Sequence, residues 1–247
     1  MQIRKKVMAV LACFLLMASS CVSEPPSSRE TEKTALERIQ DQGVLRVGYA
    51  NEAPFAYMDQ DLGRLTGEAP EIAREIARRL GVAKVEGVLT EFGALIPGLK
   101  AERFDVIAAG MYITPQRCRE ITFSNPTYRI GEAFMVRDGN PLDLHGYADV
   151  VAHPEARLGV VVGTVERGYA RELGVPDNRL LVLPDAPSAV AALQAGRIDA
   201  FGGTRLTIDD LLAKLTGDDL ARAEPFADPV CPSSDKLGQM SGQAKRS

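Results

Sequence analysis

EFGALIPGLKAERFDVIAAGMYITPQR, residues 91–117, is the segment that says most about this chain. The apolar residues of its first half recur at helical spacing and predict a helix. FDVIAAG, 104–110, follows as a continuous apolar run and predicts a buried strand. A polar loop then leads to Arg117. In an open α/β sheet, ligands bind in the loops that follow the strands. The segment therefore predicts an α/β fold with a ligand site at the end of a strand.

Three side chains of this segment are suited to binding a small molecule. Phe92, Tyr112 and Arg117 all lie near loops at the ends of the expected elements. An arginine can form a bidentate pair with a carboxylate, and the face of an aromatic ring attracts a positive charge. The segment thus predicts a ligand that carries both a carboxylate and a cation.

The same order of elements occurs twice along the chain, which predicts two lobes of similar construction. PSAVAALQAGRIDAFGGT, 187–204, repeats the helix, charged residue, large apolar residue, aspartate and strand of the first segment. Asp105 and Asp199 take equivalent places, and we expect both to be structural. The other expected helices are 34–41, 70–80 and 165–174, and the other expected strands are 44–50, 84–90, 131–137, 157–164 and 180–186. A loop is expected from 51 to 70, with a polar turn at 59–63. Two lobes joined by extended crossings would enclose a cleft.

The N-terminus has the layout of an export signal. A basic start precedes an apolar run of about eleven residues, which is too short to span a bilayer comfortably, and small residues follow it. We expect residues 1–20 to be a signal peptide and 21–36 to be a tether. Cys21 would then be the new N-terminus, and the segment resembles the lipobox of bacterial lipoproteins. Lipidation at Cys21 would attach the protein to a membrane, whereas the alternative is a soluble secreted protein.

Composition is that of a globular protein, with 45% hydrophobic and 25% charged residues. The net charge of −4 becomes three units more negative when the signal peptide leaves, which argues against nucleic-acid binding.

Cys118 and Cys231 could form a disulfide, although we favour free thiols. No Cys/His cluster has metal-ligand spacing, and no cofactor is expected; His145 and His153 are expected at the surface.

Four longer stretches give the chain a family resemblance: LRVGYANEAPFAY (45–57), LTGEAPEIAREIARRLG (65–81), LIPGLKAERFDVIAAGMYITPQRCREITFSNPTY (95–128) and ALQAGRIDAF (192–201). Together they resemble the solute-binding proteins of ABC importers, in the amino-acid-binding branch. The resemblance implies a two-lobed, type II periplasmic-binding-protein-like fold with the ligand cleft between the lobes. We expect the first lobe at 37–135 and the second at 136–227.

Within that branch, NEAPF, GEAPEIA, EGVLTEFGALIPGLK and AAGMYITPQRC look most like ectoine/hydroxyectoine-binding proteins. Ectoine is a compact zwitterion with a carboxylate and a delocalised amidinium charge, which aromatic faces can hold. The resemblance implies an aromatic cage for the cation, an arginine for the carboxylate, a glutamate for a ring N–H, and a threonine and a glycine beside them. The implied ligand-binding residues are Glu52, Phe55, Phe92, Gly110, Tyr112, Arg117, Thr164 and Thr204.

Thr204 occupies a position at which amino-acid binders of this branch usually carry an aspartate. That aspartate holds the free α-ammonium of the ligand, and an unpaired ammonium in a dry site would cost several kcal/mol. The threonine therefore argues against a primary α-amine and favours ectoine, whose nitrogen is part of the ring.

The resemblance ends near Val230. Relatives return there to the first lobe with a strand and a long helix, whereas this chain continues as CPSSDKLGQMSGQAKRS. The segment lacks helical or strand periodicity, so we expect 228–247 to be a return crossing and an aberrant, disordered tail. The first lobe would then lack its C-terminal part, through a frameshift, an early stop or a natural short variant.

The sequence therefore predicts a monomeric, exported binding protein, in the periplasm or on the outer face of the cytoplasmic membrane. It would capture ectoine or hydroxyectoine by hinge closure and deliver it to the membrane permease subunits of an ABC importer. It would perform no catalysis. One alternative is a polar amino-acid-binding protein of the same family, and a second is an enzyme resembling cyclohexadienyl dehydratase, with Glu52 as general acid. A sensor module of a larger receptor is a third.

Overall fold

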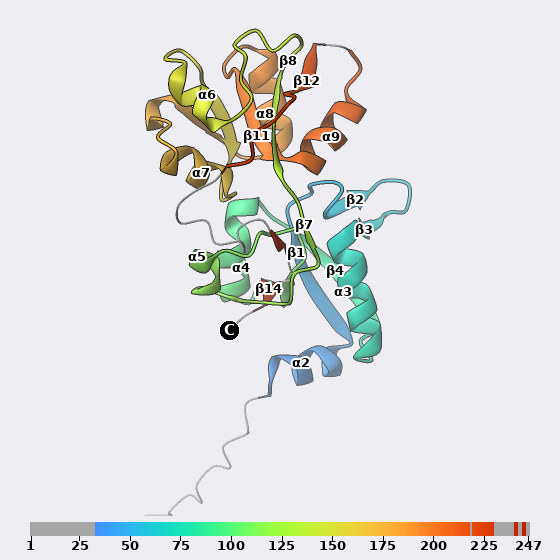
Figure 1. The fold of residues 1–247 in the computed structure, drawn as a ribbon. Coiled ribbons are helices and arrows are strands. Elements are labelled where there is room, and N and C mark those ends of the chain that lie inside the picture. Colours follow the sequence, from blue (N-terminus) through green and yellow to red (C-terminus); the bar gives the residue numbers. More distant parts are fainter. Residues whose placement is uncertain (1–32, 218, 230–239, 242–243, 246–247) are drawn as a thin grey trace, which may run out of the picture. The chain divides into compact units, whose positions relative to one another are not determined.

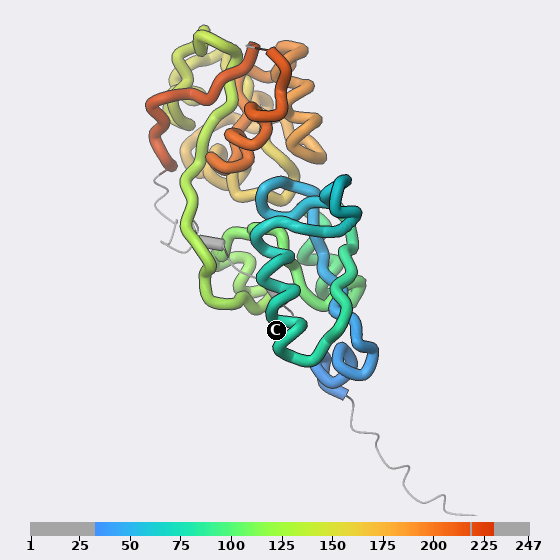
Figure 2. The backbone as a smooth tube through the Cα atoms, turned by 90° about the vertical axis from the view of Figure 1, so that its right-hand side faces the viewer, coloured from blue at the N-terminus to red at the C-terminus, as the bar shows by residue number. Residues whose placement is uncertain are grey.

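A computed structural model of the chain describes residues 33–217, 219–229, 240–241 and 244–245. The expected signal peptide, Cys21 and most of the expected tether lie outside these residues. Two five-stranded sheets form the cores of two lobes (Figure 1). The backbone passes from the first lobe to the second through the extended segment that leads into strand β8 (Figure 2). Among the described residues, no helix is long and apolar enough to cross a membrane.

The first lobe is built on a sheet with the strand order β4-β1-β5-β14-β6. Strands β4, β1 and β5 are parallel, and β14 is antiparallel to both of its neighbours. Helix α3 packs on β1 and β4, and α4 packs on β1 and β5. Its elements are α2 (Ala35–Gln42), β1 (Val44–Tyr49), β2 (Tyr57–Asp59), β3 (Arg64–Thr66), α3 (Glu68–Arg79), β4 (Lys84–Leu89), η1 (Phe92–Ala94), α4 (Leu95–Lys100), β5 (Val106–Ile107), α5 (Pro115–Cys118), β6 (Thr122–Phe123), β7 (Tyr128–Arg129), β13 (Met240–Ser241) and β14 (Ala244–Lys245).

The second lobe is built on a sheet with the order β10-β9-β11-β8-β12. Strands β10, β9 and β11 are parallel, whereas β8 is antiparallel to β11 and β12. Helix α8 packs on β9 and β11, and α9 packs on β8 and β12. Its elements are β8 (Glu132–Arg137), α6 (Tyr147–Ala152), β9 (Leu158–Val161), α7 (Glu166–Glu172), η2 (Asp177–Arg179), β10 (Leu180–Leu183), α8 (Ala186–Gln194), β11 (Ala200–Thr204), α9 (Arg205–Lys214) and β12 (Leu220–Arg222).

Equivalent arginine–aspartate pairs hold the strands of the two lobes together. Asp105, before β5, accepts hydrogen bonds from the backbone N–H and the guanidinium of Arg46 on β1. Asp199, before β11, accepts the same two kinds of bond from Arg157. Both aspartates are nearly buried in these pairs. The prediction that they are structural counterparts is confirmed.

Small apolar residues bring the helices close to the sheets. In α3, Ala69, Ala73 and Ala77 are buried, and Pro70 lies within the first turn, where its missing N–H is tolerated. Helix α8 begins after Asp185, whose carboxylate accepts a hydrogen bond from the backbone N–H of Ser188 at 2.8 Å. Because these helices are fixed at their starts, the loops beside them have defined positions at the ends of the strands.

Three predictions differ from the structure. The expected loop 51–70 contains the hairpin β2–β3 on either side of its polar turn. The expected lobe boundary after residue 135 falls inside β8, which belongs to the second sheet from Glu132 onward. In the expected disordered tail, residues 240–241 pair with β7, and 244–245 insert between β5 and β6, because backbone pairing needs no apolar periodicity. The remaining residues from 230 onward, including Cys231, lie outside the described part. Cys118 is exposed and free.

Candidate ligand-binding site

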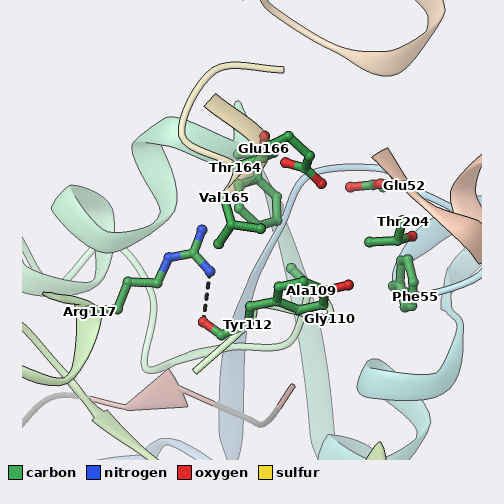
Figure 3. Close-up of a pocket in the computed structure, with 11 residues that line it drawn as sticks. Glu52, Phe55, Ala109, Gly110, Tyr112, Arg117, Thr164, Val165, Glu166 and Thr204 are labelled. Atoms are coloured by element: carbon green, nitrogen blue, oxygen red, sulfur yellow. Dashed lines mark hydrogen bonds between the residues drawn. The ribbon is translucent and has the colours of Figure 1, made fainter. Parts of the chain in front are cut away.

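All eight residues predicted for the site line a single pocket between the lobes (Figure 3). The cavity has a volume of about 30 Å³, so the lining side chains lie close together in this structure. Its lining is Glu52, Phe55, Phe92, Ala109, Gly110, Tyr112 and Arg117 from the first lobe, and Thr164, Val165, Glu166 and Thr204 from the second. Ala109, Val165 and Glu166 were not predicted. The geometry brings the eight residues together, and their contact with a ligand stays a prediction.

Arg117 lies at one end of the pocket and also connects the lobes. Its guanidinium donates to the carbonyl oxygen of Tyr112 at 2.7 Å and to that of Gly163, in the second lobe, at 2.9 Å. Its position is set by α5, whose first turn is capped by the Thr114 hydroxyl. Burial lowers the pKa of Arg117 to about 10, so the side chain stays cationic at neutral pH. A buried cation of this kind can anchor a carboxylate.

The aromatic residues lie on different sides of the pocket. Phe92 contacts the protein's own cation, because the Cζ atom of Arg117 lies 5.7 Å from the centre of its ring. Phe55 is buried and stacks on Tyr128 with the ring centres 6.0 Å apart. Tyr112 is also buried, and its hydroxyl donates to the Ile130 carbonyl at 3.3 Å. Phe55 and Tyr112 are thus held rigidly, as a cation cage requires.

Gly110 has a positive φ of 63°, and the structure gives this residue a role that the sequence did not predict. A Cβ atom here would lie 2.7 Å from Cγ of Phe55. The absence of a side chain at this residue makes room for the Phe55 ring. A side chain at position 110 would displace that ring.

Glu52 lies across the pocket from Arg117 and is held by the second lobe. Thr207 of α9 donates its hydroxyl proton to Glu52 Oε1 at 2.6 Å. Thr204 caps the same helix, since its Oγ1 accepts from the backbone N–H of Thr207 at 3.2 Å. Burial raises the pKa of Glu52 to about 7; the nearby carboxylates of Glu166 and Asp210 add to the rise, and the Thr207 bond opposes it. Thr204 therefore acts on Glu52 through Thr207 as well as lining the pocket.

Thr164, in the loop before α7, and Glu166, the first residue of α7, are two polar residues that the second lobe contributes. The Thr164 hydroxyl donates to the Val161 carbonyl at 2.8 Å, which leaves its oxygen able to accept. Glu166 is only 3% exposed although it is an acid. Nothing in the local sequence distinguishes it from the many surface glutamates that begin helices, so the sequence did not reveal it.

Gly163 fixes how closely the lobes approach each other at the pocket. Its φ is 80°, and a Cβ atom at this position would lie 2.4 Å from the Cα of Gly93 in the first lobe. Both atoms belong to backbone segments that carry site residues, Phe92 on one side and Thr164 on the other. The close approach therefore depends on the absence of a side chain at residue 163.

We expect Gly163→Ala to lower ligand affinity about tenfold or more, because the methyl group would keep the lobes apart and shift the equilibrium away from the closed form. Titration calorimetry with the cognate ligand measures the effect. Gly139→Ala is a matched control, since Gly139 has a similar φ of 73° but nothing within 4 Å of its Cβ position. Equal losses in the two variants would mean that backbone strain, and not lobe separation, is responsible.

The described residues hold no group of three or more His, Cys, Asp or Glu side chains that could bind a metal ion. The site instead has a buried arginine, two acids and three aromatic rings, gathered from two lobes. Such an arrangement is suited to binding a small polar molecule between two lobes. It defines the class of two-lobed solute-binding proteins with a type II periplasmic-binding-protein fold.

The sequence profile of the bacterial extracellular solute-binding proteins, family 3, matches residues 45–197. The chain belongs to this family. A probable amino-acid ABC transporter periplasmic-binding protein of Sinorhizobium fredii is 36% identical over 197 residues. That match covers 79% of this chain and 64% of the relative, so it spans less than two thirds of that protein's length.

Two solved structures are similar over most of the described fold. The crystal structure of EhuB in complex with hydroxyectoine is 40% identical, with a TM-score of 0.77, and the match covers 85% of this chain and 79% of EhuB. An ancestral amino acid-binding protein, described as a precursor of cyclohexadienyl dehydratase, is 28% identical, with a TM-score of 0.70 and 86% of each chain covered. The expected fold class and the resemblance to amino-acid- and ectoine-binding proteins are confirmed.

Proposed function

We propose that this protein is the substrate-binding component of an ABC importer and that it captures ectoine or hydroxyectoine by closure of the two lobes. It would then deliver the solute to the membrane permease subunits. The observation that carries the proposal is the pocket itself, with Arg117 at one end, Glu52 at the other and aromatic rings between them. A zwitterion with a carboxylate and a delocalised cation matches this distribution of charge.

The eight residues would have distinct roles. Arg117 would pair with the ligand carboxylate, and the Thr164 hydroxyl would turn from the Val161 carbonyl to donate to that carboxylate. Glu52 would accept a ring N–H, and the Phe55 and Tyr112 faces would lie against the amidinium. Phe92 would support Arg117 and also face the ligand, while Gly110 keeps the Phe55 ring in place and Thr204 holds α9 and Thr207 toward Glu52. The similarity to a protein solved with hydroxyectoine supports this assignment.

Titration calorimetry of the purified chain with ectoine, hydroxyectoine, proline and glutamine tests the proposal. We expect saturable heat with ectoine or hydroxyectoine and at least about tenfold weaker binding of the two amino acids, because neither presents a planar delocalised cation. Circular dichroism establishes that the chain is folded before the titration. A folded chain that binds glutamine or proline more tightly than ectoine would contradict the proposal.

A polar amino acid is the second candidate ligand. Glu166 gives the pocket a second acid, which could hold an α-ammonium even though Thr204 lacks a carboxylate. The relative from Sinorhizobium fredii carries an amino-acid transporter name. The glutamine titration distinguishes this candidate, since it predicts tight binding of glutamine or a similar amino acid and weak binding of ectoine.

We propose no catalytic activity. The similarity to a dehydratase precursor makes a direct assay worthwhile: incubation with prephenate, followed by absorbance of phenylpyruvate, would reveal an enzyme of that kind.

We further propose that the protein is exported and anchored through Cys21. Mass spectrometry of the protein purified from bacterial membranes would detect the acylated N-terminal cysteine.

A further inference from the structure

Glu166 is a buried acid of the second lobe that the proposed ligand contacts do not yet use. It begins α7, lines the pocket and is 3% exposed. Its Oε2 atom is buried, and a hydrogen bond joins the carboxyl groups of Glu166 and Glu132. A buried carboxylate is costly unless donors reach it. Glu166 also lines the pocket, so a ligand can approach its carboxyl group.

The carboxyl groups of Glu166 and Glu52 face each other across the pocket (Figure 3). Each comes from a different lobe, and their charges are close enough to raise the pKa of Glu52 by repulsion. Glu52 is already paired with Thr207 on one oxygen. A cationic group between the two acids would relieve their repulsion and would provide donors to both lobes at once.

Glu132 lies behind Glu166, outside the pocket lining, and is 1% exposed. Burial raises the pKa of Glu132 well above its usual range, and the Glu166 carboxylate raises it further. The same burial raises the pKa of Glu166, while the Thr164 hydroxyl and the nearby charge of Arg117 favour its ionised form. Tyr112 and Asp228 also affect the pKa of Glu132, and the charges of Glu132 and Glu166 raise the pKa of Tyr147. Of these two acids, Glu166 is the one that lines the pocket.

We propose that Glu166 is a second specificity-determining acid, which binds the cationic side of the ligand from the second lobe while Glu52 binds it from the first. The inference rests on the proposed function, since it concerns the same zwitterionic ligand. A planar amidinium has two N–H groups pointing in different directions, so it can donate to both acids. A ligand with a single N–H donor or a neutral ring would leave one buried carboxylate unpaired.

The test compares Glu166→Gln and Glu166→Asp with the unmodified chain by titration calorimetry with ectoine. Glutamine keeps the shape and removes the charge, whereas aspartate keeps the charge on a shorter side chain. We expect about a tenfold loss of affinity or more for Glu166→Gln and a smaller loss for Glu166→Asp, because a charged acceptor contributes more than a neutral one. Glu91→Gln is the control, since it removes an exposed acid near the same cleft and should change affinity less than about twofold.

Thermal melting of the ligand-free variants shows that each is folded. The inference is overturned if Glu166→Gln binds ectoine with unchanged affinity, or if the glutamine and aspartate variants lose affinity equally. Ectoine binding by the unmodified chain preserves the proposed function in either case. If the unmodified chain binds glutamine in place of ectoine, the proposed function is wrong, and the same variants titrated with glutamine decide the role of Glu166. A folded unmodified chain that binds neither ligand overturns both.

Discussion

Arg117→Ala is expected to lower ectoine affinity by at least about a hundredfold, because it removes a buried cation from the carboxylate end of the pocket. Two effects combine. The ligand carboxylate would enter a dry site without its partner, and the closed form would lose the hydrogen bond from Arg117 to Gly163 in the second lobe. Arg117→Lys should recover little affinity, since an ammonium cannot reproduce the planar fork that reaches several acceptors together.

Titration calorimetry at neutral pH measures this loss, and Arg119→Ala is the matched control. Arg119 ends the same short helix but is exposed and does not line the pocket. We expect Arg119→Ala to bind ectoine as the unmodified chain does. Ectoine binding within tenfold of normal in Arg117→Ala would remove the carboxylate anchor from the proposed mechanism.

Glu52→Gln is expected to have opposite effects on binding and on stability. In the ligand-free fold the pKa of Glu52 is about 7, against an ordinary value of 4.5, and burial is the main cause. The folded state thus holds a proton between about pH 4.5 and 7 that the unfolded chain releases, so stability falls as pH rises through this range. Above pH 7 the ionised carboxylate is a cost, and glutamine removes it. We expect the variant to gain about 1–2 kcal/mol of unfolding free energy at pH 8, a discounted figure because the residue is only half-buried, and nothing at pH 4.

The pH dependence of ligand affinity should be opposite to that of stability. A cationic ligand needs the ionised carboxylate, so the affinity of the unmodified chain should fall as pH drops below 7, by up to about tenfold per pH unit. Glu52→Gln should bind about tenfold or more weakly at pH 8 and lose this pH dependence. Urea unfolding at pH 4 and 8 and calorimetry between pH 5.5 and 8 measure the two effects. Glu155→Gln is the control, because it changes an exposed acid away from this pocket, and it should change neither stability nor affinity. If Glu52→Gln is less stable than the unmodified chain at pH 8, the raised pKa of Glu52 is contradicted.

Local patterns were sufficient for the fold class and for Phe92, Tyr112 and Arg117, whereas the other five predicted pocket residues came from the family resemblance. Periodicity located the helices and buried strands, and the recurrence of Arg–Phe–Asp (103–105) as Arg–Ile–Asp (197–199) indicated the second lobe. The hairpin β2–β3 and strand β14 were missed because strands of two or three residues are too short to show a periodicity. They form through backbone hydrogen bonds to neighbours that the sequence alone does not place beside them.

Glu166 and the Gly163–Gly93 contact could not be predicted for a different reason. Each depends on the distance between two lobes whose residues are far apart in the chain. A helix-starting glutamate has the same local signature whether it faces water or a pocket. Its burial becomes evident when the second lobe lies against the loop of Glu52. Likewise, a glycine after a strand indicates a turn, but not that another backbone will lie 2.4 Å from its missing side chain.

Two hydrogen bonds between described residues of the two lobes have a consequence for the rate of ligand exchange. Arg117 to Gly163 and Thr207 to Glu52 lie on opposite flanks of the pocket, so a bound solute leaves after both have broken. Residence time is then governed by how often the protein opens, and not by how tightly any one group holds the solute. A protein of this kind releases its cargo slowly in free solution. It can release cargo rapidly where another molecule pulls the lobes apart, which is what a receiving transporter would have to do.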